Sequence, residues 1–122
     1  MQMIHHLALR LQALHAAGYT HRDLKPPNVM WLPRENRWTL IDFGTAARIG
    51  YNARLGFSFA YAAPEVIDTF RNKQKRMVVS AKLDSWSLGV VAFELLTGEP
   101  PFPLQWNSDE VRCSTSPEDA AI

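Results

Sequence analysis

Two adjacent prolines, Pro26 and Pro27, place the strongest constraint on how this chain can fold. Neither has a backbone N–H to donate, and each fixes its own φ, so a helix cannot continue through them. They lie in the segment HRDLKPPN, residues 21–28, which also contains an aspartate, a lysine and an asparagine. We therefore expect an ordered loop that holds a carboxylate, an ammonium and an amide close together.

The runs on either side of this loop predict a helix before it and a hairpin after it. Apolar residues recur at helical spacing between residues 4 and 14, and Gly18 follows where a helix would end. After the loop, residues 29–32 and 38–41 are rich in β-branched and aromatic side chains. The sequence PREN between them is a turn composition, so we expect these two runs to pair as a short hairpin.

The middle of the chain lacks a clear period. Residues 45–62 contain Gly50 and Gly56 as breakers, so we expect a long exposed loop of the kind that tends to carry function. Farther on, RNKQKR at residues 71–76 has four positive charges between apolar runs. This composition is typical of a solvated surface loop, and recognition of an acidic or phosphorylated partner is the alternative.

The last apolar run predicts a second long helix. Residues 83–96 are nearly all apolar, with Asp84 at an N-cap position and Gly98 just past the end. A helix that is apolar on most sides is expected to be buried at the centre of a domain. Beyond it the tail is polar, and residues 108–110 could start one more helix.

Composition limits the class of protein. The 122 residues are the length of one domain, and 47% apolar content is enough for a core. A net charge of +1 provides no global field for nucleic acid or anionic lipid. The longest apolar stretch, residues 88–93, is far shorter than the roughly 20 residues of a membrane span. The single cysteine, Cys113, and an N-terminus without a leader-like pattern predict an intracellular protein, cytoplasmic or nuclear.

Four motifs follow one another in a familiar order. HRDLKPPN, IDFG, YAAPE and DSWSLG resemble the catalytic loop, metal motif, activation-segment end and central helix of eukaryotic protein kinases. The resemblance extends from the first predicted helix to Gly98. It implies an α+β fold, the mainly helical C-terminal lobe of a protein-kinase-like fold with a short β-hairpin after the catalytic loop.

The resemblance implies the chemistry of phosphoryl transfer for four residues. Asp23 would be the base that orients the attacking hydroxyl and takes its proton. Lys25 would contact the transferred phosphoryl group, and Asn28 and Asp42 would be the metal ligands that hold Mg²⁺ against the nucleotide phosphates. The implied cofactors are ATP and Mg²⁺, with Lys25, Asn28 and Asp42 binding them. Lys25 and Pro26 look like the serine/threonine branch, which implies a protein substrate with a Ser or Thr hydroxyl.

Further residues of the motifs have expected structural roles. Asp84 resembles the residue that ties the central helix to the backbone of the HRD turn, and a plain N-cap is an alternative compatible with it. His21 and Phe43 are expected to be packing anchors. The histidines His5 and His6 are expected on the surface of the first helix.

Regulation by phosphorylation of the activation loop is not expected. Arg22 resembles the arginine that receives a loop phosphate in many kinases, yet within residues 45–62 the part ahead of the YAAPE motif, which begins at Tyr61, offers only Thr45, Tyr51 and Ser58 as acceptors. Ser58 aligns with a threonine that contacts the substrate in this family, which makes it a poor switch.

The sequence contains neither a glycine-rich loop nor a VAIK-like lysine. We therefore interpret residues 1–122 as a partial protein kinase domain that lacks the N-terminal lobe and the late helices. Alone, it is expected to bind MgATP weakly and to transfer phosphate negligibly. Two other functions stay open: a non-catalytic module that binds partners or substrates, and a small-molecule phosphotransferase, which shares the H-x-D…N loop. APE and DSWSLG favour the protein-kinase form.

Overall fold

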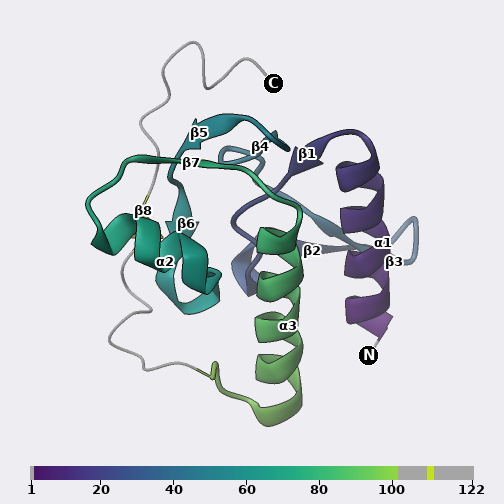
Figure 1. Ribbon diagram of the computed structural model, residues 1–122. Coiled ribbons are helices and arrows are strands. Elements are labelled where there is room, and N and C mark those ends of the chain that lie inside the picture. Colours follow the sequence, from purple (N-terminus) through teal and green to yellow (C-terminus); the bar gives the residue numbers. More distant parts are fainter. Residues whose placement is uncertain (1, 102–109, 112–122) are drawn as a thin grey trace.

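The computed structural model describes residues 2–101 and 110–111, and in this part of the chain helices alternate with short strands (Figure 1). The helical elements are α1 (Gln2–Ala16), α2 (Pro64–Arg71) and α3 (Lys82–Thr97), with the 3-10 turns η1 (Pro26–Asn28) and η2 (Phe59–Tyr61). The strands are β1 (Tyr19–Thr20), β2 (Val29–Leu32), β3 (Arg37–Leu40), β4 (Ala47–Arg48), β5 (Asn52–Arg54), β6 (Phe57–Ser58), β7 (Arg76–Val78) and β8 (Glu110–Val111). This mixture of elements is an α+β fold.

The described strands form two-stranded antiparallel sheets. β2 and β3 form a hairpin, whereas β1 pairs with β4, β5 with β7, and β6 with β8. The last three pairs join segments that are far apart in the sequence. As a result, the stretch that contains β4, β5 and β6 is held to elements before and after it.

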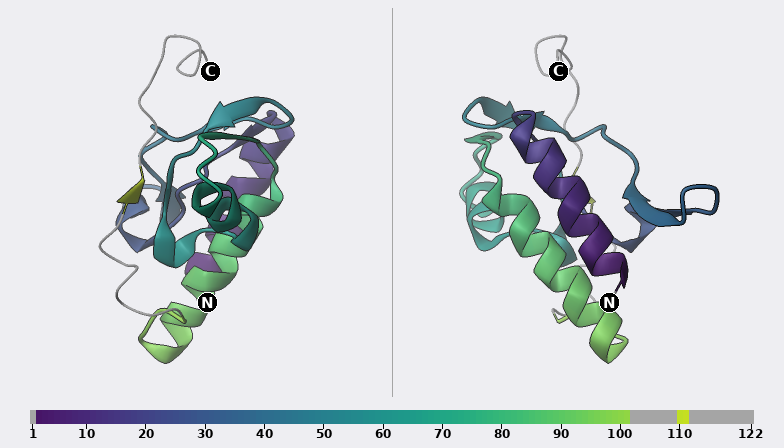
Figure 2. Two further views of the ribbon diagram at one scale, coloured as in Figure 1. Left: turned by 60° about the vertical axis from the view of Figure 1, so that its left-hand side comes forward. Right: turned by 90° about the vertical axis from the view of Figure 1, so that its right-hand side faces the viewer.

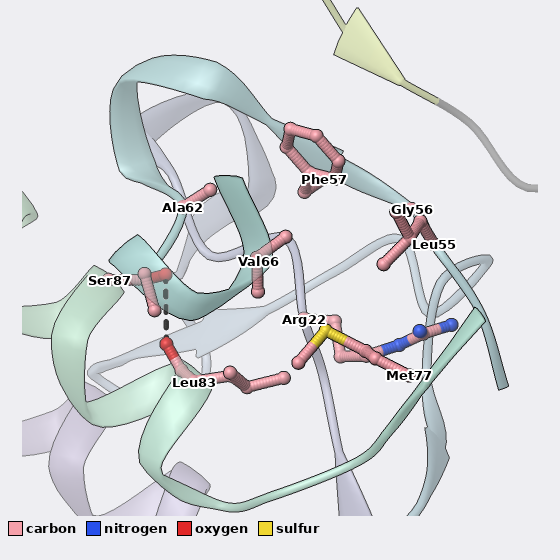
Figure 3. A pocket seen from close by; sticks show the side chains of 10 residues that line it. Arg22, Leu55, Gly56, Phe57, Ala62, Val66, Met77, Leu83 and Ser87 are labelled. Carbon is pink, nitrogen blue, oxygen red and sulfur yellow. Dashed lines mark hydrogen bonds between the residues drawn. The ribbon is translucent and has the colours of Figure 1, made fainter. Parts of the chain in front are cut away.

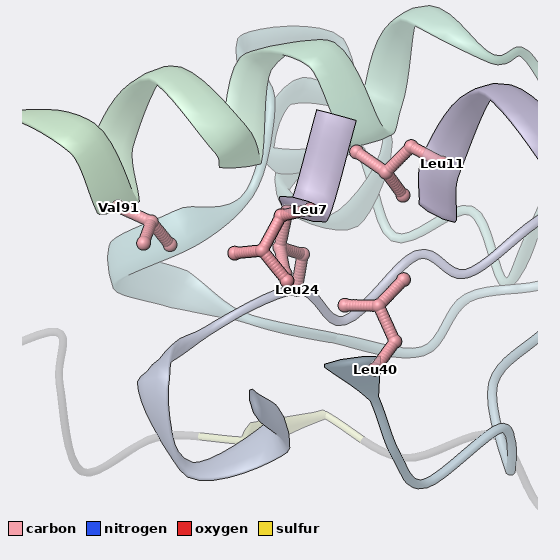
Figure 4. Packing of buried hydrophobic residues seen from close by; sticks show 5 residues of the cluster. All are labelled: Leu7, Leu11, Leu24, Leu40 and Val91. Atoms are coloured by element: carbon pink, nitrogen blue, oxygen red, sulfur yellow. The ribbon is translucent and has the colours of Figure 1, made fainter. Parts of the chain in front are cut away.

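The two long helices lie side by side, with the β2–β3 hairpin on the flank of α1 (Figure 2, right). The first hydrophobic cluster joins them and is formed by Leu7, Leu11, Leu24, Leu40 and Val91 (Figure 4). Its members come from α1, the HRDLKPPN loop, β3 and α3. The loop therefore inserts one apolar side chain, Leu24, into the place where both helices and the hairpin meet.

A second cluster lies beneath α2. It consists of Leu55, Phe57, Ala63, Val66 and Leu83, and so connects the region around β6 with α2 and the start of α3. The ring of Phe57 meets those of Phe59 and Phe70 edge-on, with centroids 5.0 and 5.6 Å away. Edge-to-face pairs of this kind add to the stability that burial provides.

The predicted hairpin and helix ends are confirmed. Trp31 and Trp38 stand opposite each other in the hairpin with ring centroids 5.3 Å apart, a cross-strand pair that stabilises such a sheet. Gly18 and Gly98 follow α1 and α3 with φ of 94° and 85°. This left-handed conformation is open to glycine at no steric cost, and it ends each helix where the sequence predicted.

Two expectations about exposure were wrong. Residues 45–62 are not an exposed loop, because Ala47, Ala53 and Phe57 are buried where β4, β5 and β6 pair with other strands. The central helix is buried only in part: Val91 is fully buried in the first cluster, whereas Leu96, on the last turn, is 70% exposed. An apolar face is buried only where a neighbouring element covers it, which the periodicity of the helix does not specify.

Residues 71–76 are exposed as predicted, although Arg71 ends α2 and Arg76 begins β7. Glu110 lies in β8 rather than in a helix, and residues 108–109 are outside the described part. Among the described residues, none of the helices combines the length and apolar character that crossing a membrane requires.

Hydrogen bonds connect Tyr61, at the start of the YAAPE motif, to α3. The hydroxyl of Tyr61 donates to both carboxylate oxygens of Glu94, at 2.6 and 2.9 Å, and Ser87 Oγ donates to the Tyr61 carbonyl oxygen at 2.7 Å. Burial raises the pKa of Tyr61 well above its ordinary value, and the adjacent Glu94 carboxylate raises it further. The folded state thus holds the Tyr61 proton more tightly than the unfolded chain does.

This contact predicts a loss of stability at alkaline pH. Above about pH 10 the unfolded chain releases the tyrosine proton and the folded chain keeps it, so the free energy of unfolding falls as pH rises. We expect Tyr61→Phe to lower the stability at neutral pH by about 1 kcal/mol, through the lost hydrogen bond, and to flatten the alkaline decline. Urea unfolding at neutral pH and above pH 10 measures both effects. Tyr51→Phe, at a ring that is 60% exposed, should keep the wild-type decline; an equal decline in Tyr61→Phe would contradict the assignment.

Candidate active site

The HRD turn is held by one buried carboxylate. Asp84, fully buried at the start of α3, accepts the backbone N–H of His21 on Oδ2 and that of Arg22 on Oδ1, both at 2.9 Å. Its Oδ2 also accepts from His15 Nε2 at 2.8 Å. Arg22 has φ of 74°, a conformation that costs a non-glycine residue about 1–3 kcal/mol and persists only where neighbours enforce it. The two backbone hydrogen bonds that Asp84 accepts enforce this conformation.

These contacts decide between the two roles expected for Asp84. The N-cap of α3 is Ala81, and the side chain that accepts an N–H at that end is Ser80, whose Oγ accepts the Lys82 N–H at 3.1 Å. Both carboxylate oxygens of Asp84 instead accept backbone N–H groups of the HRD turn. The predicted connection to the turn is therefore confirmed, and the N-cap alternative is wrong.

His21 fixes the direction of the catalytic loop from inside the core. Its ring is fully buried, donates from Nε2 to the Ile41 carbonyl at 2.9 Å, and accepts the Asp23 N–H on Nδ1 at 3.1 Å. A ring that donates on one nitrogen and accepts on the other is in its neutral tautomer. The expected anchoring role of His21 is thus confirmed. Phe43 touches this ring edge-on at 5.1 Å but is itself 48% exposed, so it is not a buried anchor.

Polar side chains converge on Asp23. Ser58 Oγ donates to Asp23 Oδ1 at 2.8 Å, and Lys25 Nζ donates to Ser58 Oγ at 2.7 Å. Lys25 Nζ also lies 3.8 Å from Asp23 Oδ2. Asn28 Nδ2 donates to the Asp23 carbonyl at 2.7 Å and approaches Asp23 Oδ2 at 3.4 Å. Three of the four predicted site residues, Asp23, Lys25 and Asn28, are therefore brought together.

The core explains why these side chains face one another. Leu24 is fully buried in the first cluster, whereas Lys25 is only partly buried. Because Leu24 points into the core, its neighbours Asp23 and Lys25 are directed toward β6. There Phe57 enters the second cluster and Ser58 faces the loop, as expected for successive residues of a strand.

Asp42, the remaining predicted ligand, lies just after the hairpin. The N–H of Ile41 donates to the Asn28 carbonyl at 2.9 Å, which carries the chain from β3 back to the catalytic loop. Asp42 itself has φ of 59°, is exposed, and accepts the Gly44 N–H on Oδ1 at 3.2 Å. Its role as a metal ligand stays a prediction. In the described part of the chain, no group of three or more His, Cys, Asp or Glu side chains gathers as a metal site.

Arg22 connects the HRD turn to residues 45–62, which follow the DFG motif. Its Nε donates to the Thr45 carbonyl at 2.6 Å and its Nη1 to the Arg54 carbonyl at 2.7 Å. The guanidinium thus binds main-chain oxygens at two points of the segment that follows DFG.

A small pocket lies behind this arginine. Figure 3 shows it between the segment before β6, α2 and the start of α3, with Leu55, Val66, Met77 and Leu83 pointing into it beside Arg22. Its lining is mainly apolar and includes none of Asp23, Lys25 and Asn28. The pocket is thus distinct from the polar cluster.

Two members of this arrangement, His15 and Ser58, make contacts that the sequence does not predict. His15 was not assigned any role, and a single histidine near the end of an amphipathic helix gives no local signal that its partner is Asp84. Ser58 was aligned with a substrate-contacting residue, but its bonds to both Asp23 and Lys25 were not foreseen. His6 was placed on the helix surface, yet its Nδ1 accepts the Trp38 N–H at 3.0 Å, because α1 packs against β3.

Comparison with known proteins agrees with these motifs. The family described as "Protein kinase domain" matches residues 1–118. Citron rho-interacting kinase of Rattus norvegicus is 41% identical over 100 residues, which cover 79% of this chain and 5% of that protein. Serine/threonine-protein kinase MRCK gamma of Mus musculus is 37% identical over 101 residues, covering 79% and 6%. Serine/threonine-protein kinase SBK1 of Danio rerio is 36% identical over 108 residues, covering 87% and 28%.

The fold and these matches define the class: the chain belongs to the protein kinase domain family, and it is similar to serine/threonine kinases. It spans between 5% and 28% of the length of the three relatives.

The role of Asp84 yields a stability prediction. Asp84→Asn replaces one acceptor oxygen by an NH₂ group that faces buried N–H donors, so we expect a loss of about 2–4 kcal/mol in the free energy of unfolding. Urea unfolding gives the value. Asp68→Asn, the same change at an exposed position on α2, should stay within about 0.5 kcal/mol of the wild type. Equal stability of the two variants would show that Asp84 is not the anchor.

Proposed function

We propose that this site transfers the γ-phosphoryl group of ATP to a serine or threonine hydroxyl of a protein substrate. The observation that carries the proposal is the hydrogen bond from a hydroxyl, that of Ser58, to Asp23 Oδ1 at 2.8 Å beside the Lys25 ammonium. A general base must lie within such reach of the hydroxyl that it orients. Asp23 is 3% exposed, so contacts within the protein, and hardly any with solvent, set the orientation of its carboxylate.

In this proposal Asp23 accepts the proton of the attacking hydroxyl. Asn28 and Lys25 support this role of Asp23. Asn28 holds the Asp23 carbonyl through Nδ2, which fixes the backbone of the base. Lys25 provides a positive charge at the same point, where the negative charge of a transferred phosphoryl group would need compensation.

The donor atoms fit magnesium. Both hydrogen bonds of the Asn28 side chain come from Nδ2, which leaves its Oδ1 as a ligand oxygen. Asp42 contributes a carboxylate, and Mg²⁺ binds in other proteins through one or two carboxylates together with phosphate oxygens. We propose that Asn28 and Asp42 hold Mg²⁺, which when bound would neutralise the nucleotide phosphates. The relatives support a protein substrate, since two of them are named serine/threonine-protein kinases.

At the level of the whole chain, residues 1–122 are proposed to be a partial kinase domain of the C-terminal-lobe type. The sequence has no glycine-rich loop to cover the phosphates. We therefore propose weak nucleotide binding and negligible transfer by this chain alone. The single cysteine supports a reducing, intracellular location.

The metal site is testable without activity. Mn²⁺ with ATP is a paramagnetic substitute for MgATP, and it should broaden the NMR signals of the Asn28 side-chain amide and of the Asp42 N–H. Asp42→Ala should lose most of this broadening, whereas Asp68→Ala, at an exposed carboxylate on α2, should keep it. Broadening that is absent at millimolar MnATP, or equal in both variants, would contradict the assignment.

Activity gives a second test. The purified 122-residue chain should phosphorylate a serine peptide at least about a thousandfold more slowly than the roughly 1–100 per second typical of protein kinases. Any residual transfer should disappear in Asp23→Asn and persist in Asp68→Asn. Robust transfer by the isolated chain would refute the weak-activity proposal, and transfer to an amino sugar or choline instead of the peptide would refute the protein substrate.

A further inference from the structure

One edge of the β2–β3 hairpin is closed by a histidine of α1. Trp38 stands opposite Trp31 in the ladder, yet its N–H donates to His6 Nδ1 at 3.0 Å instead of to β2. In an antiparallel pair, residues that bond across the ladder alternate with residues whose N–H and C=O groups point outward. Trp38 is of the second kind, and in the described part of the chain β3 pairs with no strand other than β2. The imidazole of His6 therefore takes the place of a neighbouring strand.

This hydrogen bond exists only while the ring of His6 is neutral. Nδ1 accepts an N–H through its lone pair, so the ring carries its single proton on Nε2. A second proton would make both ring nitrogens donors, and the Nδ1–H would then face the N–H of Trp38. Imidazole is the side chain that ordinarily changes charge between about pH 5 and 8. Mild acid thus converts the acceptor at the edge of β3 into a donor.

The surroundings of His6 do not compensate for its protonation. Among the described residues no carboxylate pairs with it, and its ring neighbour is another histidine, His5, with centroids 6.1 Å apart. Arg10 follows one turn later on α1, and like charges at this spacing repel. The ionisable groups of the elements that pack against α1 are engaged elsewhere: Arg37 of β3 binds Glu35, Asp84 of α3 binds His15 at the other end of α1, Glu94 of α3 accepts from Tyr61, and Tyr19 of β1 accepts from Arg48.

We propose that His6 is a pH-sensitive contact that holds β3 on α1 at neutral pH and releases this edge of the hairpin on acidification. The strand concerned leads to the site. It continues into Ile41, whose N–H donates to the Asn28 carbonyl and whose carbonyl accepts from His21, and Ile41 is followed by Asp42. The proposal concerns the packing of β3 and does not rest on what Asp42 binds.

Hydrogen exchange of the Trp38 amide in the full 122-residue chain tests the contact. We expect its protection, corrected for the intrinsic exchange rate, to fall about tenfold between about pH 7.5 and about pH 5.5, the effect of losing roughly one hydrogen bond. His6→Gln supplies a carboxamide oxygen that accepts but takes up no proton, so its protection should not depend on pH. His5→Gln, at the exposed neighbouring histidine, should behave as the wild type does. The Leu55 amide, which donates to the Lys75 carbonyl, reports whether the fold is intact.

PH-independent protection of Trp38 in the wild type overturns the proposal. So does the same decline in His6→Gln as in the wild type, because some other group would then be responsible. Neither result bears on nucleotide or metal binding, and failure of the MnATP test would leave this one unaffected.

Urea unfolding of the same variants gives a second test. The unfolded chain takes up the His6 proton more readily than the folded chain does, so the free energy of unfolding falls as pH falls through the histidine range. His15, His21 and His5 titrate alike in the wild type and in His6→Gln, so the difference between these two proteins isolates His6. We expect the unfolding equilibrium constant of the wild type to rise roughly three- to tenfold more than that of His6→Gln over this pH interval. Parallel pH profiles of the two proteins overturn the proposal.

Discussion

The site depends on the carboxylate of Asp84. It is fully buried, and a buried charge is tolerated only when hydrogen bonds compensate for lost water. The backbone N–H groups of His21 and Arg22 and the ring of His15 supply this compensation. The same bonds hold Arg22 in a left-handed conformation that it would not otherwise keep. Thus the requirement to satisfy one charge on α3 sets the path of a loop that comes some sixty positions earlier in the sequence.

With the turn fixed, the hydrophobic core determines where the polar side chains point. Leu24 has to enter the cluster between α1, β3 and α3, and this leaves Asp23 and Lys25 facing Ser58. Successive side chains of any extended segment point in opposite directions, so when one of them is buried its two neighbours face the other way. The reactive groups are therefore oriented by apolar contacts on the opposite side of the backbone, and a cavity at Leu24 would disturb the site without removing any of its polar atoms.

Features with local causes could be predicted from the sequence, and features with distant partners could not. The two long helices α1 and α3, the hairpin and Gly98 follow from residues within a few positions of one another, whereas α2 was not predicted. The strands within residues 45–62 are two or three residues long, too short to show a period, and each forms only because a remote segment lies beside it, as Met77 does beside Ala53. The motifs identified Asp23, Lys25 and Asn28, but the contact of His15 with Asp84 depends on the packing of α1 against α3.

The conformation of the activation segment, residues 45–62, is maintained by contacts other than those of a phosphate group. Two hydroxyl residues of the segment are engaged beside the HRD turn: Thr45 donates to the His21 carbonyl at 2.9 Å, and Ser58 to Asp23. Arg22, the residue that resembles a phosphate receptor, already binds two carbonyl oxygens of the segment. Pairing of β4 with β1 and of β5 with β7 supplies further main-chain bonds. Because these contacts engage both the hydroxyls and the backbone of the segment, its conformation is maintained by the fold, and a phosphate at Thr45 or Ser58 would have to break contacts before it could make any.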